Sequence, residues 1–282
     1  MRSDVPPPYP FCAVVGLEAA KKALLLHAVQ PRLNGVLLCG EAGTAKTTLV
    51  RGLAELVPHR RLFRIPLHAT EDRLLGGLDT GYAVRHGERR LSPGLLAEAD
   101  GHTAALDDLN LMPESVLKTI AHAAEDGSFA VEREGLSGRR QSRFLLYGTM
   151  NPLEGMPAGA ILDRFGLFVR VEAAKDARDR AEIVRRRLAF ERDPDAFRRE
   201  YDTATAELRE RVEQASRLLP AVRASESAVR LCGEIAREAG CPGHRAELGL
   251  LRAALAIAAW EGGAEALPEH VQEAAGYVLP HR

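Results

Sequence analysis

The sequence lacks any long apolar run. Its largely apolar stretches, such as residues 23–29, are far shorter than the roughly 20 residues that a membrane-spanning helix needs. The first ten residues are rich in proline and contain no apolar signal core, so we expect residues 1–10 to form a flexible lead-in. Together these absences predict a cytoplasmic protein that does not bind a membrane.

Cysteine is scarce, and charge of either sign is in no excess. The four cysteines, Cys12, Cys39, Cys232 and Cys241, show no Cys-x-x-Cys or Cys/His spacing, so we predict free thiols and no zinc or iron–sulfur site. The formal net charge of −1 creates no overall field that favours nucleic acid, and we predict no nucleic-acid partner. A chain of 282 residues with 46% apolar and 27% charged residues is typical of one large or two small globular domains.

Short apolar segments alternate with helical patterns over the first 173 residues. Strands are predicted at 35–39, 62–66, 103–106, 144–148 and 167–171, and helices at 16–29 and 46–57. This alternation is typical of βαβ units, and it predicts an α/β fold with a parallel sheet that is covered on both faces. Two segments interrupt the pattern: residues 130–143 predict a hairpin and residues 80–90 a second insertion. Their arginines (Arg85, Arg89, Arg90, Arg133, Arg139 and Arg140) are too much charge for a core, so we expect both segments to project and to contact partners or the pore of a ring-shaped assembly. The alternative is a surface that is only solvated.

The pattern becomes purely helical after residue 174. Helices are predicted at 176–191, 207–219, 225–239, 247–261 and 268–279. We therefore predict three parts: the lead-in 1–10, an α/β domain over 11–173 and a helical domain over 174–282.

Residues 40–48, GEAGTAKTT, follow a predicted strand and open a predicted helix, which is the context that a phosphate-binding loop requires. Glycines let successive backbone N–H groups converge on phosphate oxygens, Lys46 would neutralise the β- and γ-phosphates, and Thr47 would bind Mg²⁺. The usual pattern has glycine where this chain has Ala45, which is tolerable if Ala45 keeps a negative φ. The alternative is a glycine turn that only caps a helix.

Asp107 and Asp108 come directly after the third predicted strand. The first would hold Mg²⁺ through water, and the second would polarise the attacking water. The alternative is a pair of loop-capping aspartates.

Three further residues are candidates for the same chemistry. Asn151 follows the fourth predicted strand and could orient the attacking water, although Asn-Pro is also a common turn. Arg164, in the segment ILDRF, suits binding to a phosphate on a neighbouring subunit, since the guanidinium group of arginine is always charged and presents its N–H donors as a fork. Arg245 would reach the nucleotide from the helical domain. Without the other motifs, the Asp-Arg pair that contains Arg164 would usually be a surface salt bridge, and Arg245 would be a solvated residue in the first turn of a helix.

Several longer stretches are more distinctive than these motifs. They are LHATEDRLLGGLD (67–79), SPGLLAEA (92–99), LDDLNLM (106–112), AVEREGLS (130–137), GTMNP (148–152), LDRFGL (162–167), EIVRRRLAFERDPDAF (182–197) and GHRAELGLLRAA (243–254). From about Phe11 to Arg282, the chain resembles the AAA+ ATPase subunit of magnesium chelatase and related cobalt-chelatase-like ATPases. It departs from them at Asp108, where relatives carry glutamate, at Ala45 and at Leu17.

The resemblance implies an AAA+ core with a five-stranded parallel sheet, followed by an all-α lid that packs away from its usual position. It implies ATP and Mg²⁺ as cofactors, with Thr47 and Asp107 at the metal. Lys46, Asp108, Asn151, Arg164 and Arg245 would be catalytic. The nucleotide would be bound by Val15, Gly16, Gly40, Glu41, Ala42, Gly43, Thr44, Ala45, Lys46, Thr47 and Thr48.

The resemblance also implies partners. The chain would form a homo-oligomeric, hexameric ring that drives insertion of Mg²⁺ or Co²⁺ into a tetrapyrrole, with a von Willebrand A-domain subunit and a large tetrapyrrole-binding subunit. Two alternatives stay open: a MoxR-like remodelling ATPase with a von Willebrand A partner, and a weakly hydrolysing nucleotide-binding scaffold. Asp108 and Ala45 favour the scaffold, whereas Lys46, Thr47 and the two arginines oppose it.

Overall fold

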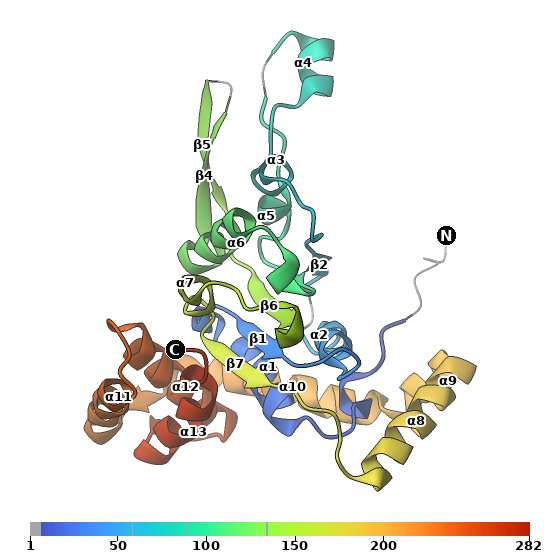
Figure 1. The fold of residues 1–282 in the computed structure, drawn as a ribbon, viewed down its shortest axis with the longest axis vertical. Coiled ribbons are helices and arrows are strands. Elements are labelled where there is room, and N and C mark those ends of the chain that lie inside the picture. Colours follow the sequence, from blue (N-terminus) through green and yellow to red (C-terminus); the bar gives the residue numbers. More distant parts are fainter. Residues whose placement is uncertain (1–6, 58, 89, 134) are drawn as a thin grey trace.

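A parallel sheet of five strands forms the centre of the molecule (Figure 1). The computed structural model describes residues 7–282 except 58, 89 and 134. The strands follow the spatial order β2-β3-β6-β1-β7, with bounds β1 Val36–Cys39, β2 Leu62–Arg64, β3 Thr103–Leu106, β6 Leu145–Met150 and β7 Leu167–Arg170. Each lies within two residues of its predicted position, so the predicted five-stranded α/β core is confirmed.

Both faces of the sheet are buried. Successive side chains of β1 point to opposite faces of the sheet, and all four of them are buried. Val36 and Leu38 pack in one apolar cluster with helix α1 (Glu18–Val29). Leu37 and Cys39 pack in a second cluster with helix α6 (Glu114–Asp126). The short apolar run of β1 is thus explained by a strand covered on both sides.

Helices α1 and α2 (Lys46–Leu53) are both shorter than predicted. Gly16 and Leu17 have φ values of 64° and 58°, a left-handed conformation that cannot continue a helix, so α1 begins at Glu18. Helix α2 begins at the predicted lysine but ends at Leu53 instead of residue 57.

The second half of the chain is helical, as predicted. Its helices are α8 (Ala177–Arg192), α9 (Pro194–Glu200), α10 (Asp202–Leu218), α11 (Glu226–Glu238), α12 (Arg245–Trp260) and α13 (Pro268–Val278). Helix α9 was not predicted, although Asp193 caps it by accepting from the Ala196 N–H at 2.9 Å and Pro194 occupies its first turn.

The lid packs on the α1 side of the sheet. Helix α12 contacts α10, α11 and α13, and both α10 and α12 also contact α1. Residues of α1, β1, α12 and α13 share one apolar cluster, so the lid is joined to the sheet by a continuous core.

The predicted flexible lead-in falls largely on residues 1–6, which lie outside the described residues. For its last part the prediction is wrong, because Tyr9 packs against the rings of Phe190 and Phe197, with centroid distances of 5.1 and 5.4 Å, and Pro10 is buried. The start of the described chain is therefore held by helices α8 and α9.

Two segments project from the sheet on the same side (Figure 1). One is the hairpin of β4 (Ser128–Arg133) and β5 (Leu136–Gln141), and the other carries α3 (Glu71–Leu75), α4 (Thr80–His86) and α5 (Leu95–Glu98). Arg140 donates to the carbonyl of Leu91 at 3.3 Å, which links the two. Projection was predicted for both segments; Arg89, one of the arginines of the second segment, lies outside the described residues. In the described part of the chain, no helix combines the length and the apolarity needed to cross a bilayer.

Candidate functional site

The loop between β1 and α2 has the backbone that a phosphate cradle needs. Gly40 has no room for a side chain, since an added Cβ would lie 2.1 Å from the carbonyl oxygen of Val171. Gly43 has a φ of 80°, which favours glycine. Thr44 closes the loop by donating its hydroxyl to the Glu41 carbonyl at 2.8 Å. Residues 41–43 are exposed, so the loop opens toward solvent before α2 begins.

Ala45 does not keep the negative φ under which its methyl group would be tolerated without strain. Its φ is 64°, in the left-handed region, and it directly precedes the first residue of α2. The condition stated for alanine at this position is therefore not met. The loop keeps the backbone that glycine would adopt and accepts a strain of about 1–2 kcal/mol for the methyl group.

Lys46 is a buried cation at the start of α2. Only 7% of the residue is exposed, and its ammonium donates to the carbonyl oxygens of Gly40 at 2.5 Å and Glu41 at 2.7 Å. Burial lowers the pKa of Lys46, and the nearby carboxylate of Asp108 opposes this shift. The fold thus holds one positive charge inside the loop where phosphates would bind.

Thr47 and Asp107 are in contact, although 60 positions separate them in the sequence. The Thr47 hydroxyl donates to one carboxylate oxygen of Asp107 at 3.0 Å. The other oxygen of Asp107 accepts from Arg64 at 2.7 Å. Sequence reasoning missed Arg64, whose position at the end of β2 was the available signal, because the ends of parallel strands meet at one edge.

Asp108 and Asn151 lie at the same edge, after β3 and β6. The backbone N–H of Asp108 donates to Thr149 Oγ1 at 3.2 Å, and its φ of 49° turns the chain sharply after the strand. Asn151 is 9% exposed, and its side-chain oxygen accepts from the Leu153 N–H at 3.2 Å. The turn-forming role considered for Asn151 is thus present, and among the described residues its amide nitrogen has no hydrogen-bond partner.

Two cavities flank the loop. One of about 500 Å³ is lined by Val15, Gly16, Gly43–Ala45 and Thr48 on the core side. Its other wall is α8, through Asp179, Arg180, Ile183, Val184 and Arg187, none of which was predicted. A second cavity, of about 770 Å³, lies beside Gly40, Glu41 and Thr44 and reaches Pro152 and Arg170. The loop therefore has room on both sides for a nucleotide.

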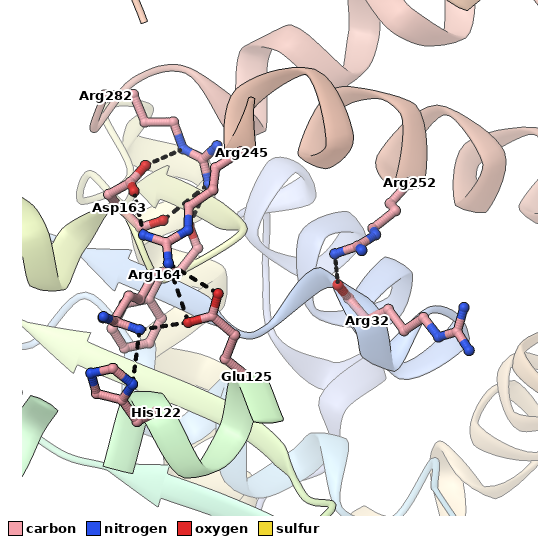
Figure 2. A network of polar contacts seen from close by, with 9 residues as sticks. Arg32, His122, Glu125, Asp163, Arg164, Arg245, Arg252 and Arg282 are labelled. Atoms are coloured by element: carbon pink, nitrogen blue, oxygen red, sulfur yellow. Dashed lines mark hydrogen bonds and ion pairs between the residues drawn. The ribbon is translucent and has the colours of Figure 1, made fainter. Parts of the chain in front are cut away.

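The two predicted catalytic arginines lie elsewhere. Arg164 follows helix α7 (Gly159–Leu162) and precedes β7, so it lies where the parallel strands begin, which is called here the amino edge of the sheet. The loop lies where the strands end, at the carboxyl edge. Arg245, the first residue of α12, lies beside Arg164 (Figure 2). The structure brings these two residues together but not to the Lys46 of the same chain.

A network of ion pairs holds the two arginines (Figure 2). Glu125 accepts from Arg164 at 2.5 Å and from Arg245 at 3.1 Å. Asp163 accepts from Arg245 at 3.1 Å and lies 3.6 Å from Arg282. Hydrogen bonding to Asp163 raises the pKa of Arg245, so the network favours its charged form.

A cavity of about 350 Å³ opens at this network. Two carboxylates and five arginines line it, which gives a formal net charge of +3; the arginines are Arg32, Arg164, Arg245, Arg252 and Arg282. A cavity of this charge attracts anions, and guanidinium groups match the geometry of phosphate oxygens.

Comparison with known proteins agrees with this geometry. An AAA domain (dynein-related subfamily) matches residues 35–165, and an AAA lid domain matches residues 230–282. An uncharacterised protein of Mycobacterium tuberculosis is 42% identical over 98% of this chain, which spans 45% of that relative's length.

Shorter relatives align over most of their own length. The magnesium-chelatase subunit ChlI homolog of Methanocaldococcus jannaschii is 37% identical over 97% of this chain and 85% of its own. The magnesium-chelatase 38 kDa subunit of Rhodobacter capsulatus is 36% identical over 98% of this chain and 88% of its own length. A solved structure of the complex between subunits BchI and BchD of magnesium chelatase contains a chain that matches with a TM-score of 0.56 and 36% identity, over 98% of this chain and 96% of that one. The chain therefore belongs to the AAA+ ATPases, in the family of the magnesium-chelatase ATPase subunit.

Proposed function

We propose that this chain binds MgATP at the carboxyl edge of its sheet and hydrolyses it within a hexameric ring of identical copies. The observation that carries this proposal is the division of the catalytic groups between opposite edges. Lys46 lies at one edge, and Arg164 and Arg245 lie at the other. Because no single chain unites these groups, a complete site requires the carboxyl edge of one copy to meet the amino edge of the next.

The residues of the carboxyl edge fit MgATP. The loop 40–45 supplies backbone N–H groups, and Lys46 supplies a buried positive charge. Thr47 and Asp107, already 3.0 Å apart, present the oxygen ligands that Mg²⁺ takes in nucleotide sites. Asp108 would polarise the attacking water and Asn151 would orient it. Val15 and Gly16 would contact the rest of the nucleotide from the cavity wall.

The amino edge supplies the complementary half. Arg164 and Arg245 would stabilise the negative charge that develops on the γ-phosphoryl group bound to the neighbouring copy. The net charge of +3 around their cavity supports this role, since it favours a polyanionic ligand.

The names of the relatives support a more specific role. We infer that the ring drives a chelatase complex that inserts Mg²⁺, or Co²⁺, into a tetrapyrrole. It would act with a von Willebrand A-domain subunit and a large tetrapyrrole-binding subunit that performs the metal insertion. The structural likeness to the complex of BchI and BchD supports the first of these partners.

Steady-state ATP hydrolysis tests the proposal. Turnover per chain should rise steeply with protein concentration as rings form, and adding the two partner subunits should yield a metallated tetrapyrrole, detected by its absorbance. A turnover that is independent of concentration would contradict a site shared between copies. Stimulated hydrolysis without a metallated product would instead favour a remodelling ATPase.

A weakly hydrolysing scaffold is the second candidate, and Asp108 favours it. Its side chain is one methylene shorter than glutamate, which reduces its reach by roughly 1.3–1.5 Å. Asp108→Glu should raise the turnover number and leave ATP affinity unchanged, as measured by hydrolysis and calorimetry on the same preparation. An unchanged or lower turnover would mean that the site is adapted to aspartate.

A further inference from the structure

Glu125 occupies an unfavourable position for a carboxylate. It lies in the last turn of α6, where the helix dipole places partial negative charge and favours cations. The last turn of α6 contains no basic residue of its own. The cations at this helix end come instead from two other parts of the chain, Arg164 after α7 and Arg245 at the start of α12.

Glu125 is placed to pair these two arginines. One of its oxygens accepts from Arg164 at 2.5 Å and the other accepts from Arg245 at 3.1 Å. The side chain of Glu125 is 28% exposed and that of Arg164 only 17%, whereas Arg245 is 47% exposed. Two guanidinium groups that bind the same carboxylate lie close enough to repel each other, and the negative charge between them offsets this repulsion.

The arginines keep donors free for a ligand. Within the described residues, the contacts of Arg164 to Glu125 and His122 both use Nη1, which leaves Nε and Nη2 available. Arg245 uses both terminal nitrogens, for Asp163 and Glu125, and faces an open cavity. Glu125 therefore fixes the orientation of both side chains without occupying all of their donors.

We propose that Glu125 is a positioning residue, whose carboxylate holds Arg164 and Arg245 side by side so that both reach the phosphates bound to a neighbouring copy. This inference rests on the proposed function and adds a residue to it. Glu125 itself makes no contact with the nucleotide. It acts by fixing the two guanidinium groups before the neighbour arrives.

The test is Glu125→Gln in the full chain, which keeps the size of the side chain and removes its charge. Because Lys46 lies at the other edge, ATP affinity measured by calorimetry should stay unchanged. The turnover number should fall about 10- to 100-fold, the typical loss when a catalytic group shifts by an ångström. The matched control is Glu114→Gln at the opposite end of α6, an exposed residue that pairs with Lys118 and should leave turnover unchanged.

Mixed rings separate positioning from a merely structural role. Glu125→Gln mixed with Lys46→Ala should regain activity, because some interfaces join an intact loop to intact arginines. Glu125→Gln mixed with Arg164→Ala should regain none, since both variants damage the same edge. A lower unfolding temperature, or a failure of Glu125→Gln to form rings in size-exclusion chromatography, would assign Glu125 a structural role and overturn the proposal.

The single variants also separate this inference from the function on which it rests. Full turnover in Glu125→Gln, together with a strong loss in Arg164→Ala, would overturn the role of Glu125 alone. Full turnover in both variants would remove the proposed role of the arginines as well.

Discussion

The two edges of the sheet carry sites of different construction. At the carboxyl edge, nine consecutive residues, 40–48, form most of the site, and the ends of β3 and β6 add Asp107, Asp108 and Asn151. At the amino edge, the cluster is assembled from α6, the segment after α7 and the start of α12, so that Glu125 and Arg245 are 120 positions apart. The first site depends on local backbone conformation, whereas the second depends on how the lid packs against the core.

This difference has a functional consequence. A contiguous loop forms wherever β1 and α2 form, so we expect the carboxyl edge to bind a nucleotide in a single chain. The arginine cluster exists only while α12 stays docked, because Arg245 belongs to the lid and Glu125 to the core. We therefore expect ATP binding and ATP hydrolysis to be separable properties, which variants of each edge can test.

The largest effect should come from Arg164→Ala. In other phosphate-loop enzymes an arginine supplied to the γ-phosphate accounts for about 10³–10⁵ in rate, so hydrolysis should fall by that order while ATP affinity stays nearly normal. Mixing this variant with Lys46→Ala should restore partial activity, because some interfaces then join an intact loop to an intact Arg164. If mixed rings form and remain inactive, Arg164 serves its own chain only, as the partner of Glu125.

Lys46→Ala should damage the opposite edge. The ammonium group is buried against the Gly40 and Glu41 carbonyls, and loss of a charge-assisted phosphate contact should cost ~1.5–3 kcal/mol, about 10- to 150-fold in ATP affinity. Lys118→Ala, an exposed lysine of α6, is the matched control. Unchanged affinity in calorimetry would show that the loop does not bind phosphate.

The carboxyl edge could be predicted from sequence because its signals are local. A strand, a glycine loop and a helix occur in consecutive residues, and strand ends after β3 and β6 placed Asp107 and Asn151 at the same edge. The contact between Thr47 and Asp107 agrees with that prediction. The backbone of Ala45 could not be predicted, since its φ is imposed by the loop and opposes the preference of alanine.

The amino edge could be predicted only in part. The motifs identified Arg164 and Arg245 as single residues, but nothing in the sequence pairs them with Glu125. The contact with Arg164 depends on how α6 packs beside α7, and the contact with Arg245 depends on the docking of the lid. Helix α8 was predicted, yet its place beside the loop was not, for the same reason. Long-range packing, unlike strand periodicity, leaves no fixed spacing in the sequence.

Arg139 and Arg140 of the hairpin offer a site outside both edges. Arg139 binds Ser128 Oγ through Nε at 3.0 Å and Nη2 at 2.8 Å, and Arg140 reaches the neighbouring insertion at Leu91. We expect the hairpin to contact a partner subunit, so replacing both with serine should lower partner-stimulated hydrolysis, by about 1.4- to 5-fold for each exposed ion pair lost. Basal hydrolysis should stay unchanged. Equal stimulation of variant and parent would mean that this surface is only solvated.

The smallest effect should come from Ala45→Gly, a substitution that tests whether the backbone of Ala45 is strained in the loop of the carboxyl edge. Left-handed backbone costs alanine about 1–2 kcal/mol, and glycine adds about 0.4–1 kcal/mol of entropy to the unfolded chain, so the variant should gain between 0 and about 1.6 kcal/mol. For a large chain, the upper figure corresponds to a rise of about 3–6 °C in unfolding temperature. Ala54→Gly is the matched control, since Ala54 ends the same helix at a φ of −58°, and there glycine should lower the unfolding temperature. Calorimetric scans of both variants without nucleotide measure the two unfolding temperatures and test this difference in sign. If the two substitutions lower stability alike, Ala45 is unstrained, and the conformation of the loop is no obstacle to the methyl group.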